Sequence, residues 1–270
     1  MADLTEHRHE VIGVDLAAPR DGAPGAFLRA DLTDYGQAVE VLAGADAVIH
    51  LANIPAPGLR TQSETFNQNM TMNFNVFQAA SQTRVGRVVW ASSETTLGLP
   101  FDVPPRYAPV DEDHYPVPTS TYALSKVASE TIATEIAHWS GIPFIALRFS
   151  NILGPADYRG FASYWDDPAK RKWNLWGYID ERDAAMACRL ALEADSAAFA
   201  GHSASFIIAA ADTVMTRPSA DLMRQVFPEV ALRGEVTGNT TLLSIERARH
   251  VLGFEPRHSW RDHVPSGAGS

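Results

Sequence analysis

The sequence predicts an α/β fold in which helices cover both faces of a doubly wound parallel sheet. Short apolar, β-branched runs alternate along the chain with longer amphipathic stretches, which is the pattern of strands joined by crossover helices. Runs such as VIGVD (Val11–Asp15) and AVIHL (Ala47–Leu51) are as hydrophobic as strands buried in such a sheet. With 270 residues, 46% of them hydrophobic, the chain can form one large α/β domain or one and a half smaller ones.

The first part of the chain supplies most of the expected strands and helices. The strands are Val11–Asp15, Ala26–Ala30, Ala47–Leu51, Arg87–Ala91 and Phe144–Phe149, and the helices are Tyr35–Leu42, Ser63–Gln82 and Thr119–Ser140. Four large apolar residues recur at helical spacing in the second helix, namely Phe66, Met70, Phe74 and Phe77. Thr119 or Ser120 suits the N-cap of the third helix, which follows a loop rich in proline and acidic residues at Leu99–Pro118.

After Asn151 the sequence becomes irregular and rich in aromatic residues up to Tyr178. Beyond that stretch we expect a strand at Ser205–Ala209 and helices at Arg182–Ala194, Pro218–Val226 and Ser244–Leu252. No internal repeat or low-complexity linker separates the two parts of the chain. We therefore expect two lobes that pack as one body, with the boundary after residue 151.

The composition excludes several classes of protein. The net charge is −10 and no Lys/Arg run exceeds three residues (Lys170–Lys172), which argues against binding to nucleic acid or to an anionic membrane. The single cysteine, Cys188, excludes an internal disulfide, and the nine histidines are too scattered to indicate a metal site. No apolar stretch is long enough to span a membrane, and the N-terminus is too polar for a signal peptide, so we expect a cytoplasmic protein.

The strongest chemical signal is STYALSK, in which Tyr122 and Lys126 stand four residues apart on one face of a helix. A neighbouring ammonium lowers the pKa of a tyrosine, which then exchanges a proton near neutral pH. Upstream, the strand at Arg87–Ala91 ends in Ser92-Ser93-Glu94, where parallel sheets bind their ligands. Taken separately, the Tyr–Lys pair fits a surface contact and the serines fit a turn.

Further stretches in a fixed order make the pattern specific. They are VIGVDL (11–16), ADL (30–32), DAVIHLAN (46–53), NMTMNFNVFQAA (69–80), ASSETTLG (91–98), LRFSNILGP (147–155), WGYIDERDAA (176–185) and SIERARHVLGFEP (244–256). Together with STYALSK they resemble the extended short-chain dehydrogenase/reductase family, the NAD-dependent epimerases and dehydratases. The resemblance runs from His9 to about Trp260.

The resemblance implies a Rossmann-like fold, with residues 1–151 as the NAD-binding domain and residues 152–270 as a small mixed substrate-binding lobe. The catalytic residues would be Ser93, Tyr122 and Lys126. The residues that would bind NAD are Asp15, Asp31, Leu32, Leu51, Ala52, Asn53, Asn69, Tyr122, Lys126 and Phe149. Asp15 would repel a 2′-phosphate, which favours NAD, while Arg20 leaves NADP open.

On the substrate side, Ser93, Glu94 and Asn151 occupy positions that face the substrate in the family. Arg159 could hold a carboxylate, and Trp176 in the aromatic stretch could stack on a sugar ring. The alternatives are that Arg159 is a solvated surface residue and that the aromatic residues pack the small lobe. The short segment between Asn151 and Tyr178 favours a small substrate over a nucleotide sugar.

The chain departs from the family pattern in two respects. The Gly-Thr of the helix motif is Met72-Asn73, and the usual Tyr before Gly98 is Leu97, which puts packing in question. More seriously, no glycine precedes the strand that begins at Val11, where family members have a first strand and a glycine-rich phosphate loop. We therefore expect a Rossmann-like sheet lacking its first strand and weak NAD binding by this chain.

Three explanations of that gap remain open. The first, which we favour, is that the natural protein begins about 20 residues earlier. The second is that the Val11 strand pairs directly with the Ala47 strand, and the third is that a partner chain fills the gap.

The resulting functional expectation is an NAD(P)-dependent oxidoreductase that acts on a CH–OH group of a small sugar or sugar acid, in the manner of uronate dehydrogenases. The alternatives are a sugar epimerase or dehydratase of the same family and a non-catalytic member. The helices at Ser63–Gln82 and Thr119–Ser140 resemble those that pair family dimers, so a homodimer is expected.

Overall fold

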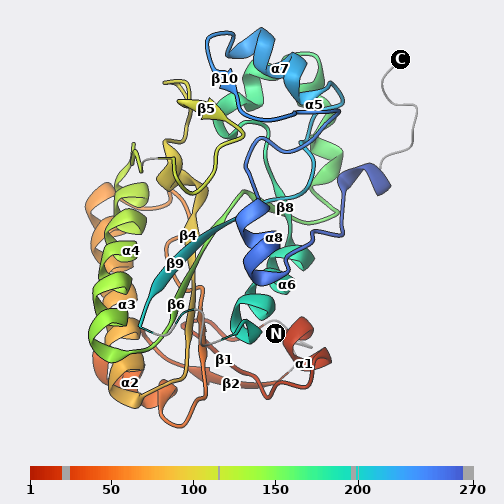
Figure 1. Ribbon diagram of the computed structural model, residues 1–270. Coiled ribbons are helices and arrows are strands. Elements are labelled where there is room, and N and C mark those ends of the chain that lie inside the picture. Colours follow the sequence, from red (N-terminus) through yellow and green to blue (C-terminus); the bar gives the residue numbers. More distant parts are fainter. Residues whose placement is uncertain (20–24, 115, 196–198, 200, 264–270) are drawn as a thin grey trace. The chain divides into compact units, whose positions relative to one another are not determined.

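The computed structural model describes residues 1–19, 25–114, 116–195, 199 and 201–263 (Figure 1). The chain forms two compact units, whose segments alternate along the sequence. Unit 1 comprises Met1–Ser92, Ser120–Leu147 and Cys188–Ser205, and unit 2 comprises Ser93–Thr119, Arg148–Ala187 and Phe206–Ser270. The predicted boundary at residue 151 concerns the binding of cofactor and substrate, and it stays a prediction.

The parallel strands expected from the sequence begin in unit 1, and three of them end in unit 2. Strands β1 (Ile12–Asp15) and β2 (Ala26–Arg29) form a two-stranded parallel sheet. A four-stranded sheet has the order β3-β4-β6-β9, with β3 at Val48–His50, β4 at Val88–Ser93, β6 at Phe144–Phe149 and β9 at Ser203–Ile208. All residues of β6 are buried, as expected for a strand covered on both faces.

The gap in the sheet lies where the sequence predicts it. In a doubly wound sheet of order 3-2-1-4-5-6 the first strand separates the second from the fourth. Here β1 pairs with β2, and β3 pairs with β4, in separate sheets. The structure thus contradicts the explanation in which the Val11 strand pairs with the Ala47 strand. Ile12, Leu16 and Leu28, on or beside these two strands, are about half exposed.

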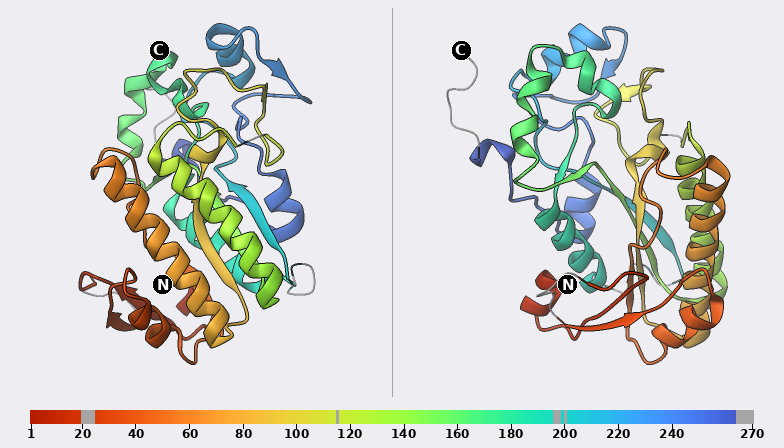
Figure 2. Two further views of the ribbon diagram at one scale, coloured as in Figure 1. Left: turned by 90° about the vertical axis from the view of Figure 1, so that its left-hand side faces the viewer. Right: turned by 180° about the vertical axis from the view of Figure 1, so that it is seen from behind.

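Three helices of unit 1, α2 (Tyr35–Leu42), α3 (Gln62–Thr83) and α4 (Thr121–Ser140), share an apolar core with β4 and β6. Helix α1 (Ala2–Glu6) has no buried residue. Helices α3 and α4 lie side by side along their length (Figure 2). Beneath them Phe77 meets Trp90 and Phe144 edge-on, each at 5.2 Å between ring centroids. This apolar core fixes α4, which carries Tyr122 and Lys126, against β4.

Unit 2 consists of short elements joined by long loops. Its described helices are η1 (Glu94–Leu97), η2 (Tyr158–Gly160), α5 (Ala162–Trp165), η3 (Pro168–Asn174), α7 (Ser219–Val226), α8 (Glu246–Leu252) and η5 (Trp260–Asp262). Two parallel strand pairs were not predicted: β5 (Tyr107–Ala108) with β10 (Ala231–Leu232), and β7 (Ile152–Leu153) with β8 (Ile179–Asp180). Helix α6 (Glu181–Glu193) begins in unit 2 and ends in unit 1.

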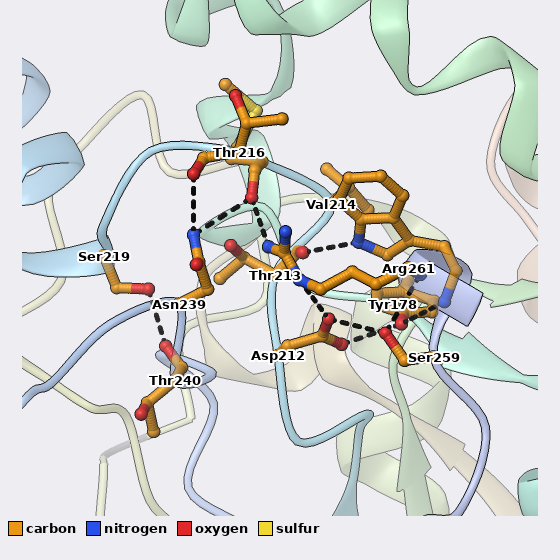
Figure 3. A network of polar contacts seen from close by, with 12 residues as sticks. Tyr178, Asp212, Thr213, Val214, Thr216, Ser219, Asn239, Thr240, Ser259 and Arg261 are labelled. Atoms are coloured by element: carbon orange, nitrogen blue, oxygen red, sulfur yellow. Dashed lines mark hydrogen bonds and ion pairs between the residues drawn. The ribbon is translucent and has the colours of Figure 1, made fainter. Parts of the chain in front are cut away.

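A polar network fixes the C-terminal segment of unit 2 (Figure 3). The Asp212 carboxylate accepts hydrogen bonds from Tyr178 (2.7 Å), Ser259 (2.8 Å) and the Arg261 guanidinium (2.9 Å). Asn239 donates to three successive carbonyls of residues 215–217. Since every one of these groups is paired within the protein, we interpret the network as structural.

No described helix combines the length and the hydropathy needed to cross a membrane.

Candidate active site

Tyr122 and Lys126 lie on the buried face of α4, in unit 1. Ser120 caps the helix by accepting a hydrogen bond from the Ala123 amide, so Tyr122 stands in the first turn. The exposed fractions are 6% for Tyr122 and 1% for Lys126. The Lys126 Nζ donates to the Ala91 carbonyl of β4 at 2.7 Å and lies 5.6 Å from the centroid of the Tyr122 ring. The pair is therefore not the surface contact that its spacing alone would allow.

Burial changes the charge state of Lys126. It lowers the pKa of the ammonium to about 7, and the Glu130 carboxylate one turn along the helix opposes that shift. Lys126 therefore titrates much closer to neutral pH than an exposed lysine does, in the range useful for acid–base chemistry.

Asn73 forms a buried polar hub beside the end of β3. Its Oδ1 accepts hydrogen bonds from His50 Nε2 (2.9 Å) and from Asn53 (2.8 Å), and its Nδ2 donates to the Ser129 hydroxyl (2.8 Å). Burial first, and Lys126 second, lower the pKa of His50 to about 4, so the imidazole is neutral. Sequence analysis missed this hub, although the Met72-Asn73 departure from the family pattern was its signal.

The segment after β3 carries three of the predicted cofactor residues, and a fourth, on α3, contacts it. Leu51 is 55% exposed, and Ala52 and Asn53 are half-buried. Asn69 of α3 is fully buried, and its amide both accepts from the Ile54 N–H (2.7 Å) and donates to the Ile54 carbonyl (3.1 Å). The structure therefore uses Asn69 to hold this segment, and an exposed backbone at 51–53 is what a flat ligand could contact.

The other predicted cofactor residues of unit 1 follow the strands of the small sheet. Asp15 ends β1, is exposed and accepts a hydrogen bond from the Ala17 amide at 3.0 Å. Asp31, just after β2, accepts from the Thr33 amide and hydroxyl, and Leu32 beside it is buried. Arg20, which left NADP open as a cofactor, lies outside the described residues.

This donor set fits parts of NAD. The exposed carboxylate of Asp15 suits a ribose hydroxyl, and Tyr122 with Lys126 suits the nicotinamide end. The pyrophosphate is different: the residues before β1 include no glycine, and helix α1 ends well before the strand. Hence the residues fit the ribose and nicotinamide portions of the cofactor and offer no glycine-rich turn for its phosphates.

In unit 2, Ser93 ends β4 and caps η1. Its Oγ accepts hydrogen bonds from the Thr95 amide (3.2 Å) and the Thr95 hydroxyl (3.0 Å), which leaves the Ser93 proton to be donated elsewhere. Phe149, at the end of β6, is 8% exposed, and Asn151 is half-buried, with its carbonyl accepting from the Ile179 amide.

Glu94 lies buried at the start of η1 and is held by other parts of unit 2. It accepts hydrogen bonds from the Ser150 hydroxyl (2.6 Å) and the Asn174 side chain (3.1 Å). Burial raises the pKa of Glu94 to about 7, while these bonds and the Arg171 guanidinium act against the rise. The carboxyl predicted to contact substrate thus joins η1 to the end of β6 and to η3.

The remaining two substrate predictions differ in exposure. Arg159 of η2 is exposed. Trp176 is fully buried, and its indole N–H donates to the Pro168 carbonyl at 2.8 Å. A side chain enclosed in the core of unit 2 has no face on which a sugar could stack, so the packing alternative describes Trp176 in this structure.

Comparison with known proteins gives a consistent family. The model of the NAD dependent epimerase/dehydratase family matches residues 1–205. The UDP-glucose 4-epimerase of Lacticaseibacillus casei is 25% identical over 293 residues, covering 90% of this chain and 85% of that protein. Further UDP-glucose 4-epimerases match at 24% identity.

Solved structures share the fold over nearly the whole chain. A UDP-galactose 4-epimerase is 27% identical, with a TM-score of 0.68 and coverage of 99% of this chain and 92% of that one. A short-chain dehydrogenase/reductase superfamily protein from Agrobacterium tumefaciens with bound NAD has a TM-score of 0.72 at 21% identity, covering 99% and 91%. A mutated uronate dehydrogenase has a TM-score of 0.66 at 20% identity, covering 100% and 82%.

Proposed function

Because the chain belongs to the NAD-dependent epimerase/dehydratase family, we propose that it is an NAD-dependent enzyme that epimerises a nucleotide sugar, with UDP-glucose as its first candidate substrate. The relatives named UDP-glucose 4-epimerase support this choice. They favour the epimerase alternative of the sequence analysis over its main expectation of a small sugar acid.

The observation that carries the proposal is the buried pair of Tyr122 and Lys126, anchored to β4 through the Ala91 carbonyl. NAD, when bound, would supply the chemistry of taking a hydride from the substrate carbon and returning it to the opposite face. Tyr122, as the phenolate, would accept the proton of the substrate hydroxyl and, as the phenol, would later give it back. The Lys126 ammonium beside it would favour the phenolate while the proton is away.

The roles of the other residues follow from the resemblance and their local geometry. The Ser93 hydroxyl, which can still donate its proton, would hold the substrate oxygen as its charge changes. Asn151 would contact the substrate, and Glu94 would act by fixing the loop that follows Ser93.

NAD would contact the residues at the ends of β1, β2 and β3. Asp15 would accept hydrogen bonds from the ribose, Asp31 and Leu32 would border the adenine, and the backbone of Leu51, Ala52 and Asn53 would line the cofactor. Asp15 favours NAD over NADP by charge repulsion with a 2′-phosphate. Phe149 would lie at the nicotinamide.

The test is to incubate the purified chain with UDP-glucose and an excess of NAD, and to separate the two epimers by chromatography. An epimerase returns the hydride, so the expected result is conversion to UDP-galactose without net growth of NADH absorbance. The variant Tyr122→Phe is the control for adventitious activity. No conversion at any NAD concentration that saturates binding would overturn the proposal.

A second candidate is an NAD-dependent dehydrogenase for sugar acids, favoured by the fold shared with a uronate dehydrogenase. It is distinguished by its stoichiometry, because oxidation of a uronate yields one NADH for each substrate consumed. If calorimetry detects neither NAD nor NADP binding, the non-catalytic alternative is the one supported.

The chain is also proposed to form a homodimer through α3 and α4. Several apolar side chains on these helices are exposed, among them Phe74 and Leu124. A hollow across the two helices is lined by Gln62, Ser63, Phe66, Asn67, Thr121 and Leu124.

A further inference from the structure

Two side-chain hydrogen bonds connect α4 to β4 in unit 1. Lys126 Nζ donates to the Ala91 carbonyl at 2.7 Å, and the Ser92 hydroxyl donates to Glu130 Oε1 at 2.6 Å. Neighbouring residues of the strand thus bind residues one turn apart on the helix. Sequence analysis treated Ser92 as a turn residue and gave Glu130 no role.

The contact with Ala91 does not by itself decide the charge of Lys126. A carbonyl oxygen accepts a hydrogen bond from an ammonium and from a neutral amine alike. Lys126 is 1% exposed, so little water compensates a positive charge there. A charged form therefore needs a negative group nearby.

Glu130 is the acidic group that acts on Lys126 among the described residues. The other groups that face the amine are the Tyr122 ring on the same helix, the Trp90 ring of β4, and His50 of β3, whose pKa is lowered to about 4. A carboxylate on a flexible side chain would lose much of its effect to solvent. Ser92, which is 3% exposed, removes that freedom by holding one carboxylate oxygen.

We propose that Glu130, fixed by the Ser92 hydroxyl, is a positioning residue that keeps Lys126 protonated near neutral pH. The inference has two parts that can fail separately. The charge of Lys126 is a property of the folded chain, whereas its consequence for proton transfer at Tyr122 rests on the proposed function.

The chain offers an unusually direct measurement, because Lys126, Lys170 and Lys172 are its only lysines. Lysine labelled with ¹³C and ¹⁵N gives three side-chain signals in NMR spectra, which the variants Lys170→Arg and Lys172→Arg assign. Titration of the Lys126 signal then reports its midpoint without substrate or cofactor.

Glu130→Gln keeps an oxygen that can accept from Ser92 and removes only the charge. We expect the Lys126 midpoint to fall by at least one pH unit, which is a tenfold fall in the ratio of protonated to neutral amine at a given pH. Ser92→Ala keeps the charge and removes the tether, so its shift has the same direction and is smaller. Glu135→Gln, on the exposed face of the same helix, is the matched control and leaves the midpoint unchanged.

An unchanged midpoint in Glu130→Gln, or an equal fall in Glu135→Gln, would overturn the inference. Circular dichroism checks that each variant folds. If Glu130→Gln does not fold, the shift of the Lys126 midpoint in Ser92→Ala decides the test. The pH profile of epimerisation supplies the second readout: loss of Glu130 moves the optimum to lower pH. A shifted midpoint with no epimerase activity in any variant would leave the inference standing and refute the proposed function.

Discussion

At the scale of single residues, the chemistry depends on polar groups that the protein buries and pairs. Lys126, Glu94 and Asn73 each have an exposed fraction of 4% or less, and each is held by at least one hydrogen bond from another element. Burial without a partner would cost several kcal/mol. Two of these groups have pKa values near 7, the range useful for proton transfer at neutral pH.

Removing the Tyr122 hydroxyl should abolish proton exchange and leave cofactor binding intact. We expect Tyr122→Phe to lower kcat for epimerisation by about 10²–10⁴-fold, the usual contribution of one acid–base group. Calorimetry should give an NAD affinity close to that of the unchanged chain. Tyr35→Phe, which removes a partly exposed hydroxyl of α2 bonded to Gln82, is the matched control. Full activity in Tyr122→Phe would refute the assignment.

Glu94 should make the stability of the protein depend on pH. The pKa of Glu94 is about 7 in the folded state, above the ordinary value of 4.5 that applies to the unfolded chain. Ionisation of this carboxyl therefore destabilises the folded state relative to the unfolded one. The free energy of unfolding should therefore fall as the pH rises from about 4.5 to about 7, by on the order of 3 kcal/mol, and stay level above.

Glu94→Gln should remove that dependence, because the amide stays neutral and the Ser150 hydroxyl can rotate to bond with it. Urea denaturation followed by circular dichroism at pH 5 and pH 8 measures the difference. Glu229→Gln, at an exposed position of unit 2, is the control. If the two variants show the same change between these pH values, Glu94 does not carry the effect.

At the scale of elements, regular segments were predictable and irregular ones were not. Helix α2 and strand β6 have the predicted bounds, because Asp34 marks the start of the helix as its N-cap and Pro143 precedes a largely apolar run in the strand. The two-residue strands β5, β7 and β10 were missed, since so short a segment has no measurable periodicity. Their pairing depends on residues far apart in the chain.

The candidate site follows the same division. The spacing of Tyr122 and Lys126 on one helix face was readable from the sequence, as was the position of Ser93 at a strand end. The partners Ala91, Ser150 and Asn174 come from other elements, so only the fold reveals them. The burial of Trp176 also depends on the fold, because a tryptophan in a loop can either stack on a sugar ring or pack in a hydrophobic core.

The Asn73 hub joins three elements and should matter for stability. Asn73→Ala would leave His50, Asn53 and Ser129 without the amide that they share. Buried polar groups that lose a partner cost about 1–3 kcal/mol each, so we expect a loss of about 2–4 kcal/mol in the free energy of unfolding. Asn67→Ala is the matched control, at an exposed position of the same helix. It makes the same change in helix propensity without breaking a buried hydrogen bond. Equal stability of the two variants in thermal denaturation would show that the hub contributes nothing.

At the scale of the whole molecule, the separate sheets β1-β2 and β3-β4-β6-β9 are the largest departure from the family pattern. The sequence predicted this gap from the absence of glycine before Val11. Because strands β1 and β3 each pair on one side in the described structure, their other edges present backbone groups that a further strand could bond.

Assembly is the last property that the whole molecule decides. Phe74 of α3 is 46% exposed and Leu124 of α4 is 45% exposed, and the two helices present an uncovered surface side by side (Figure 2). Burying such side chains against a second copy contributes about 25 cal/mol per Å² of apolar area. Leu124→Glu would bury a charge at that surface and should raise the dimer dissociation constant by at least about 100-fold, since an unpaired buried charge costs several kcal/mol. Sedimentation equilibrium measures it, with Val251→Glu, an exposed position of α8 in unit 2, as the control. A monomer at all concentrations, or a dimer that Leu124→Glu leaves intact, would refute assembly through α3 and α4.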